Sequence, residues 1–152
     1  MEIACDPRIC YARILIPTDG SEPAWDAARQ AVYLAKQCGS ELHVLYVVEG
    51  VKAFKTGIHY QEAAREMSRD GERAVKRVQK LADKEGVNCT VLAVEGDAAN
   101  TILEFAQEHH CDLIVMGSVG MNAIERVLVG SVTSKVVERA HCSVHVVRPR
   151  GR

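Results

Sequence analysis

The sequence predicts an α/β fold with a single doubly wound sheet of five parallel strands and helices on both faces. Short apolar runs alternate with longer stretches of helical periodicity along the whole chain, which is the order typical of parallel strands joined by helices. The apolar runs are also nearly continuous, without a polar residue at every second position. This pattern indicates strands that are covered on both faces.

The first half of the chain supplies two strands and one helix of this fold. Residues 13–18 form the first apolar run, and Ser21 is placed to cap a helix that Gly39 ends. The second strand is expected at residues 42–48. Residues 49–58 show no clear period and are expected to form a connection.

The middle of the chain begins with a long amphipathic helix. Its apolar stripe runs over residues 60–81, with charged residues on the opposite side, and Gly86 marks its end. The third strand is expected at residues 89–94. Asp97 is then a plausible N-cap for a helix that reaches His110.

The last part of the chain completes the alternation. The fourth strand is expected at residues 112–116, and a glycine-bearing segment follows it. A short helix over residues 131–140 then leads into the fifth strand at residues 142–147.

Size and charge limit the domain organisation and the classes of partner. At 152 residues, without a linker or a low-complexity segment, the chain is expected to form one domain over residues 1–152, with residues 1–12 as an N-terminal extension and 148–152 as a polar tail. The net charge of −1 gives no global attraction to nucleic acid or anionic membranes. No apolar stretch approaches the roughly 20 residues of a membrane span, and no signal peptide is evident. We therefore expect a cytoplasmic protein that binds neither nucleic acid nor membranes.

The cysteines and histidines predict neither a disulfide framework nor a metal site. The six cysteines are scattered without a C-x-x-C pair, and most lie at apolar strands or a helix end, so reduced core thiols are expected. Cys5 and Cys10 precede the first strand and are expected to be the most exposed; the role of this extension stays open. Two adjacent pairs, His109-His110 and His141-Cys142, could suggest a metal site. The two side chains of each pair point in different directions, so they cannot easily chelate one ion. Histidines that interact with a helix dipole are the preferred interpretation.

The most distinctive motif has the spacing G-x-x-G-x9-G-S, formed by Gly117, Gly120 and the pair Gly130-Ser131. It begins where the fourth apolar run ends, and its second part opens a helix. Glycine allows close approach to a ligand, and free N–H groups at a helix start attract anions. The first two glycines could instead form only a tight turn. The added Gly-Ser pair favours a phosphate cradle, with Ser131 and Thr133 contributing hydroxyl groups.

Asp19 follows the first strand at the same edge of the expected sheet. Ligands of doubly wound sheets bind beyond the carboxyl ends of the strands, where the strand order reverses. If the first and fourth strands are neighbours there, Asp19 faces the glycine motif and can accept hydrogen bonds from ribose hydroxyls or an adenine amino group. The alternative is that Asp19 only caps the first helix, alone or together with Ser21.

Four segments together resemble the universal stress protein family, in its ATP-binding branch. They are I-L-I-P-T-D-G-S at residues 14–21, V-M-G-S-x-G at 115–120, V-L-V-G-S-V-T-S-K-V-V-E-R-A at 127–140 and C-x-V-x-V-V-R at 142–148. The resemblance covers essentially residues 13–148. It implies the strand order 3-2-1-4-5 and a homodimer formed through the fifth strand.

The resemblance also implies an adenine-nucleotide site. The adenosine would lie at Pro17, Thr18 and Asp19, with Val47 at the adenine and Met116 and Gly117 along the base and ribose. The residues implied to bind phosphates are Gly120, Gly130, Ser131, Val132 and Thr133.

Three positions depart from the family pattern. Val119 stands where Arg or His is common, and Met121-Asn122 replaces an arginine that often follows. Both changes remove cationic contacts from the phosphate end and predict a weak preference for triphosphates. Ser143 replaces a usual proline, which concerns strand geometry only.

The expected edge position of the fifth strand, Ser143–Val147, also favours a dimer. An apolar edge left open is an aggregation hazard, and antiparallel pairing with a symmetry mate would cover it.

These observations predict a homodimeric, non-catalytic or very weakly hydrolytic module of the stress response that binds ATP, ADP or AMP, with Mg²⁺ or Mn²⁺ as a companion ion. One alternative is a slow ATP hydrolase; its ATP pyrophosphatase relatives need an S-G-G-x-D-S loop after the first strand, where this chain has P-T-D-G-S at residues 17–21. The other alternative is a nucleotide-free interaction module of the same fold.

Overall fold

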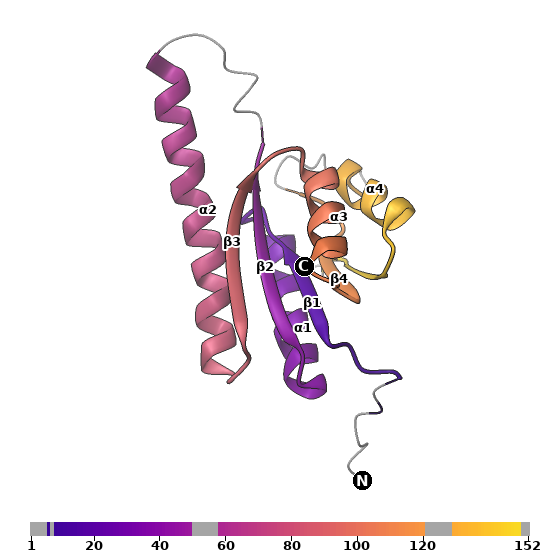
Figure 1. The fold of residues 1–152 in the computed structure, drawn as a ribbon. Helices are drawn as coiled ribbons and strands as arrows, with labels where there is room; N and C mark the ends of the chain where they lie inside the picture. Colours follow the sequence, from indigo (N-terminus) through magenta and orange to yellow (C-terminus); the bar gives the residue numbers. More distant parts are fainter. Residues whose placement is uncertain (1–5, 7, 50–57, 121–128, 150–152) are drawn as a thin grey trace.

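The structure is a computed structural model that describes residues 6, 8–49, 58–120 and 129–149; within 58–68 it describes the backbone alone. Strands and helices alternate in this part of the chain (Figure 1). Their bounds are β1 Arg13–Pro17, α1 Glu22–Cys38, β2 Glu41–Val48, α2 Ile58–Lys84, β3 Cys89–Glu95, α3 Ala98–Glu108, β4 Leu113–Gly117, α4 Ser131–Arg139 and β5 Ser143–Val147.

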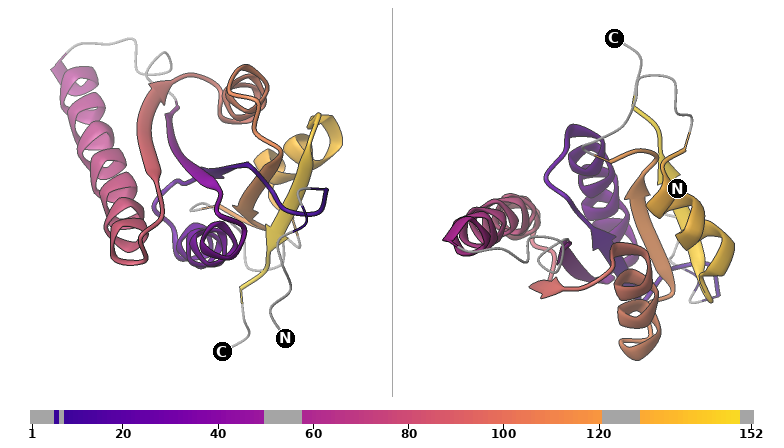
Figure 2. Two further views of the ribbon diagram at one scale, coloured as in Figure 1. Left: turned by 60° about the horizontal axis from the view of Figure 1, so that its bottom comes forward. Right: turned by 90° about the horizontal axis from the view of Figure 1, so that it is seen from above.

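The five strands form one parallel sheet in the order β3-β2-β1-β4-β5. Helices α1 and α2 cover one face, and α3 and α4 cover the other (Figure 2). The expected fold class and strand order are therefore confirmed. Strands β2 and β3 run upward in Figure 1, so the carboxyl edge of the parallel sheet lies at the top of that view.

The core is divided between the two faces of the sheet. On the α1 and α2 side, buried residues of β1 and β2 such as Ile14, Ile16 and Val44 pack against the alanines of α1 and the apolar stripe of α2. On the other side, Leu15 and Leu45 belong to a second buried cluster with residues of α3 and α4. Successive residues of a central strand thus enter different cores, which explains why the strands read as continuous apolar runs.

The helix ends follow the capping residues that the sequence indicated. The Ala24 N–H donates to Ser21 Oγ at 3.3 Å, and the Asn100 N–H donates to Asp97 Oδ2 at 3.0 Å. Gly39 ends α1 with φ of 69°, a left-handed conformation in which its N–H reaches the Ala35 carbonyl.

Strand β4 begins one residue later than expected and includes Gly117. The preceding residue, Asp112, contacts the segment that leads into β1. Its carboxylate accepts hydrogen bonds from the backbone N–H groups of Ala12 at 2.8 Å and Arg13 at 3.0 Å. This contact fixes the start of β1 against the start of β4.

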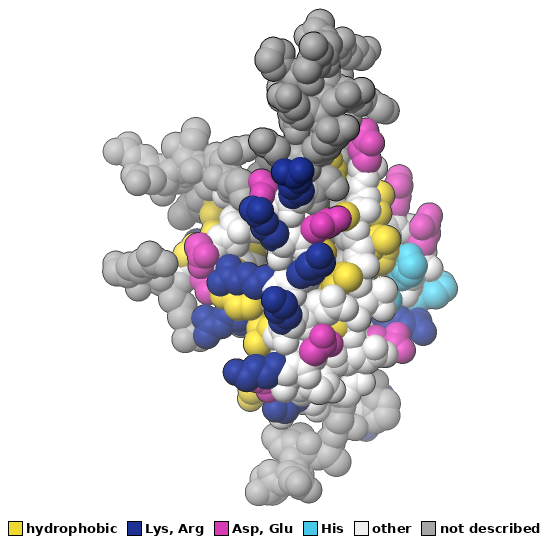
Figure 3. All heavy atoms as spheres, turned by 90° about the vertical axis from the view of Figure 1, so that its left-hand side faces the viewer, with side chains coloured by type: hydrophobic (Ala, Val, Ile, Leu, Met, Phe, Trp, Pro, Cys, Tyr) yellow, Lys and Arg dark blue, Asp and Glu magenta, His cyan; other side chains and the backbone are white. Residues whose placement is uncertain are grey.

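Helix α2 extends beyond the expected range at both ends. It approaches the sheet closely at Gly71, where an added Cβ would lie only 2.6 Å from Tyr46 Cδ1. The opposite side of the helix faces solvent and carries many basic side chains (Figure 3). None of the helices in the described ranges combines the length and apolarity that a bilayer crossing requires.

The cysteines agree with the expectation in part. Cys89, Cys111 and Cys142 are thiols at least half-buried in the core, and burial raises the pKa of Cys89 and Cys111 to about 11. Cys10 is disulfide-bonded, so the expectation of reduced thiols is wrong for this residue. Cys5 lies outside the described residues.

Candidate functional site

The two central strands separate at the carboxyl edge of the sheet. β1 pairs with β4 only through Ile14 with Leu113 and Leu15 with Ile114. In contrast, β1 stays paired with β2 to its last residue, and β4 stays paired with β5 to its last residue. The strand order reverses between β1 and β4, which is where ligands of doubly wound sheets bind. The region beyond the ends of these two strands, called the crevice below, is therefore the candidate site.

Pro17 contributes to this separation because it has no backbone N–H. The next residue, Thr18, donates its N–H to the Leu45 carbonyl of β2 at 2.9 Å. Since neighbouring residues of a strand direct their N–H groups to opposite sides, the missing N–H of Pro17 lies on the β4 side. Proline is usually excluded from central strands, and here it removes a hydrogen bond that would help to close the crevice.

Asp19 bridges the turn after β1 and the glycine motif. Its Oδ1 accepts a hydrogen bond from the Ser21 N–H at 2.9 Å. Its Oδ2 lies against Gly120, where an added Cβ would be only 2.9 Å away. Ser21 is the N-cap of α1, and the bond from its N–H means that Asp19 also supports the start of this helix. The other carboxylate oxygen faces the glycine motif, so the contacts of Asp19 fit both interpretations.

The two halves of the glycine motif meet beside Asp19. The Gly130 N–H donates to the Ser118 carbonyl at 2.6 Å, and an added Cβ on Gly130 would lie 3.4 Å from the Val119 Cα. Residues 121–128, which include the departures at Met121 and Asn122, lie outside the described residues. The start of the loop and the start of α4 thus form one continuous backbone surface.

Close packing explains why a glycine occupies position 117. A Cβ at this position would lie 3.0 to 3.1 Å from backbone and side-chain atoms of Pro23. The first turn of α1 therefore rests on the end of β4. Pro23 holds the helix that follows Asp19 against the strand that precedes the loop, a positioning role that the sequence motif did not reveal.

The amino end of α4 offers donors for an anion. Gly130 is its N-cap and supplies no capping side chain, so the first-turn N–H groups, which an α-helix leaves without internal partners, receive no acceptor from it. Ser131 is exposed beside them. Thr133 is 3% exposed, and its hydroxyl donates to the Gly117 carbonyl at 2.8 Å. Thr133 therefore joins α4 to the end of β4.

Apolar side chains line the neighbouring strands on the α3 and α4 side. Met116 of β4 is buried, while Val47 of β2 and Val132 of α4 are half-buried, and all three pack in the same cluster. An adenine ring needs an apolar surface of this kind together with a few polar groups. The structure thus brings the predicted base and phosphate residues to one edge of the sheet.

Tyr46 is a neighbour of the site that sequence reasoning missed. Its ring is nearly buried on the α2 side. Burial raises the pKa of this phenol, and the Asp70 and Asp19 carboxylates raise it further. A phenol at the end of an otherwise apolar strand was the available signal.

His43 and His109 lie apart from the crevice. His109 is the C-cap residue of α3 and stacks on Phe105 with ring centroids 4.0 Å apart. His43 of β2 lies against both rings, and its buried Nε2 has no hydrogen-bond partner among the residues that the structure describes. Burial and, after it, the charge of His109 lower the pKa of His43. Among the described residues no three His, Cys, Asp or Glu side chains gather where they could hold a metal ion.

The fold and its crevice define the class: a doubly wound α/β protein with a glycine-lined site at the switch point of its sheet. A model of the universal stress protein family matches residues 11–148. The chain therefore belongs to the universal stress protein family.

Individual relatives agree with this assignment. Universal stress protein MJ0531 of Methanocaldococcus jannaschii is 40% identical over 143 residues, covering 91% of this chain and 82% of that protein. Universal stress protein UspA from Lactobacillus plantarum superimposes with a TM-score of 0.82 at 31% identity, covering 91% of this chain and 99% of the other.

Two more distant structures of the same fold were solved with nucleotides. A universal stress protein in complex with cAMP has a TM-score of 0.67 at 24% identity, over 91% of this chain and 98% of the other. The universal stress protein from Archaeoglobus fulgidus in complex with dAMP has a TM-score of 0.62 at 23% identity, over 91% and 99%.

Proposed function

We propose that this protein binds an adenine nucleotide (ATP, ADP or AMP) in the crevice between the ends of β1 and β4. One observation carries the proposal: the Asp19 carboxylate lies against Gly120, where the Gly130 N–H and the Ser118 carbonyl join the two halves of the glycine motif. The carboxylate acceptor thus lies near the amino end of α4, whose first-turn N–H groups receive no capping side chain and suit an anion. A nucleoside with phosphates has the matching groups, hydroxyl or amino donors at one end and anionic oxygens at the other.

Different residues of the site contact different parts of the nucleotide. Asp19, with Pro17 and Thr18 behind it, accepts hydrogen bonds from the ribose or adenine, and Val47 and Met116 contact the base. The phosphates lie over the backbone from Gly117 to Gly120 and over the start of α4 at Gly130, Ser131 and Val132. Thr133 shapes this cradle through its bond to Gly117.

The site suits binding and signalling better than turnover. No lysine or arginine is placed in the described part of the loop, from Gly117 to Gly120, so Mg²⁺ or Mn²⁺ would carry much of the charge balance of ATP. We assign a non-catalytic, cytoplasmic stress-response module in which nucleotide occupancy is the signal. Slow ATP hydrolysis is the second candidate, and turnover above about 1 s⁻¹ in the presence of Mg²⁺ would establish it instead.

Calorimetric titration of ATP, ADP and AMP into the Asp19→Ala variant tests the site. Loss of its hydrogen bonds should weaken binding by about 1 to 3 kcal/mol. Asp97→Ala is the matched control, because Asp97 caps α3 on the far side of β2 from the crevice. That variant should lose stability and keep its affinity. Equal affinities of wild type and Asp19→Ala would refute the assignment, and no binding by folded wild type would favour the nucleotide-free module.

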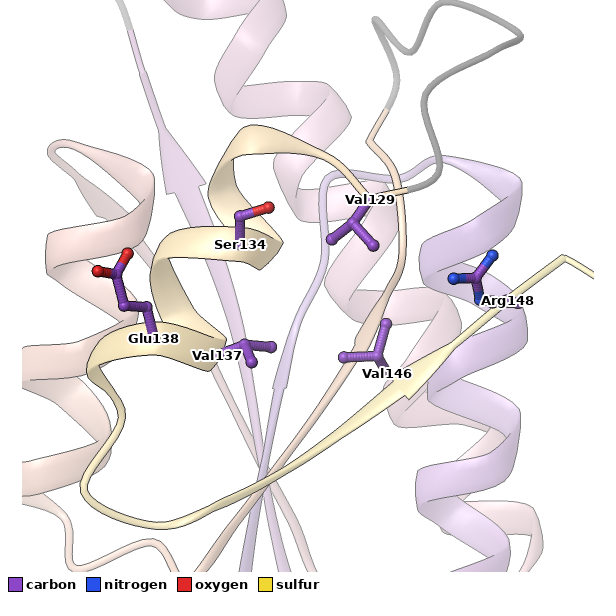
Figure 4. Close-up of a pocket in the computed structure, with 6 residues that line it drawn as sticks. All are labelled: Val129, Ser134, Val137, Glu138, Val146 and Arg148. Atoms are coloured by element: carbon purple, nitrogen blue, oxygen red, sulfur yellow. The ribbon is translucent and has the colours of Figure 1, made fainter.

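We further propose a homodimer formed through β5. This strand lies at the edge of the sheet, and a groove of about 680 Å³ lies beside it. Three valines, Val129, Val137 and Val146, point into the groove, with Glu138 and Arg148 on opposite sides (Figure 4). Val137 is 51% exposed. An antiparallel two-fold contact would cover these valines and bring Glu138 of each copy towards Arg148 of the other.

Charge exchange tests this dimer. Glu138→Arg should favour monomer in light scattering, because each half of the contact would then hold two arginine side chains that face each other and repel. Adding Arg148→Glu to the same chain should restore the dimer. Glu104→Arg on the exposed side of α3 is the control and should leave the oligomeric state unchanged. A dimer that withstands Glu138→Arg, or is not restored by the double exchange, would contradict this geometry.

A further inference from the structure

The solvent face of α2 carries a continuous band of basic side chains that the nucleotide site does not use. Its buried side is formed by Val75, Val78 and Ala82. At 3.6 residues per turn, the residues on the opposite side recur every three or four positions. In the described part of the helix these residues are exposed and basic, with the exposed carboxylates Asp70, Glu72 and Asp83 at the margins. This basic stripe consists of Arg69, Arg73, Lys76, Arg77, Lys80 and Lys84.

The basic stripe is positively charged, whereas the protein as a whole has a small negative net charge. The six cations are accompanied by three carboxylates, Asp70, Glu72 and Asp83, over residues 69–84, while the whole chain has a net charge of −1. The remainder of the chain is therefore net negative. Figure 3 shows the dark blue side chains gathered along this face, with acidic side chains towards its margins.

Internal ion pairs neutralise the stripe only weakly. Arg73 and Asp70 approach to 3.7 Å and Lys76 and Glu72 to 4.0 Å, and both basic side chains are well over half exposed. Exposed pairs of this kind contribute little. For Arg69, Lys80 and Lys84 the described part of the structure contains no ion pair within 4 Å. The positive potential of the stripe is thus available to a partner.

Arg77 gives the stripe a preordered anchor. Its guanidinium stacks on the Trp25 ring of α1 at 3.8 Å from the ring centroid, and it lies 3.7 Å from Glu22. A stacked arginine loses less conformational freedom on binding than a free one, and arginine with aromatic support is typical of residues that dominate interfaces.

We propose that the basic stripe docks an acidic helical segment of a partner protein. The cations repeat about every 5 Å along roughly 22 Å of helix, and carboxylates at three- and four-residue spacing on another helix have the same repeat. A membrane fits less well, because the apolar side of α2 is buried in the core and cannot enter lipid. A nucleic acid is wider than one helix and would meet the marginal carboxylates and the net negative remainder of the chain.

A labelled helical peptide of about 20 residues, alanine-rich with glutamates at alternating three- and four-residue spacing, is the probe for fluorescence anisotropy. The full-length protein should bind it, and raising NaCl from about 50 to 300 mM should weaken binding markedly. The double reversal Arg73→Glu with Lys80→Glu should weaken it about tenfold, equivalent to about 1.4 kcal/mol. Arg8→Glu with Arg139→Glu is the control of equal charge change outside the stripe and should stay within about twofold of wild type.

The same measurements define what would overturn the proposal. A scrambled peptide of identical composition that binds equally well would show charge attraction without a matched helical repeat. Tighter binding of a duplex DNA of equal charge, or of vesicles with anionic phosphatidylserine, would assign the stripe to a different partner. Equal loss in the control reversal would show that net charge, and not the stripe, is recognised. Circular dichroism of each variant confirms that α2 remains folded.

Discussion

Removing the Thr133 hydroxyl should destabilise the protein, because this hydroxyl holds the end of β4 to the start of α4. The Thr133 side chain is 3% exposed, and its Oγ1 donates to the Gly117 carbonyl at 2.8 Å. Thr133→Val keeps the branched shape and leaves that carbonyl without its donor. A buried acceptor that loses its partner costs about 1 to 3 kcal/mol.

The size of the chain converts this loss into a melting temperature. For a domain of this length each kcal/mol corresponds to about 2 to 4 °C, so Thr133→Val should melt about 2 to 12 °C below wild type. Thr133→Ser keeps the hydroxyl and should recover most of the loss. Measurements belong in nucleotide-free buffer at one protein concentration, since ligand and dimer formation both stabilise the folded state.

Thr90→Val provides the matched control, because Thr90 is exposed on the edge strand β3. It should change the free energy of unfolding by less than about 0.5 kcal/mol. If Thr133→Val is as stable as this control, or if Thr133→Ser is no more stable than Thr133→Val, the hydroxyl does not hold the cradle together.

Three further predictions concern pH, packing and ligand preference. Burial, and secondly the charge of His109, lower the pKa of His43 in the folded protein, so the unfolded chain binds a proton at this ring more readily than the folded protein does. The contribution of the neutral ring to the free energy of unfolding is therefore complete above about pH 6.5. Below that pH it falls by at most about 1.4 kcal/mol per pH unit. Urea titrations at pH 7.5 and 5.5 should show that the free energy of unfolding changes less with pH in His43→Leu than in wild type. Gly71→Ala should be destabilising although alanine favours helices, since its Cβ would lie 2.6 Å from Tyr46 Cδ1; a gain of roughly 1 kcal/mol, as propensity alone predicts, would refute the tight contact. Wild type should prefer ATP over AMP by no more than about tenfold without metal, and Val119→Arg should widen the gap through a charge-assisted phosphate contact; a wild-type ratio near a thousand would reveal a cationic ligand not yet identified.

The sheet and its helices were predictable because local signals agreed with the global fold. Ser21, Gly39 and Asp97 cap the helices that the sequence assigned to them, and continuous apolar runs became central strands. Asp19 was ambiguous, since aspartate suits both a helix cap and a ligand site. In the structure one oxygen of its carboxylate accepts the Ser21 N–H and the other lies against Gly120, so Asp19 contacts both the helix start and the glycine motif.

Tertiary contacts determine the roles that the sequence could not assign. Thr133 looked like a second hydroxyl for phosphate, yet its hydroxyl hydrogen bonds within the protein. Pro17 was part of a motif, but which side of β1 lacks an N–H depends on the register with β2. Cys10 gave no spacing signal for the disulfide that it forms. For Thr133 and Pro17 the deciding partner lies on another element.

Helix α2 has two faces with separable consequences for function. Its buried face meets Tyr46 of β2 at Gly71, and the next residue of β2, Val47, belongs to the proposed adenine surface. Its solvent face carries the basic stripe, on the opposite side of the same helix. Changes on the buried face should therefore alter stability and nucleotide affinity together, because they move β2 and its neighbours. Charge reversals on the stripe should alter partner binding while nucleotide affinity stays constant, because no residue of the crevice contacts that face in the described structure.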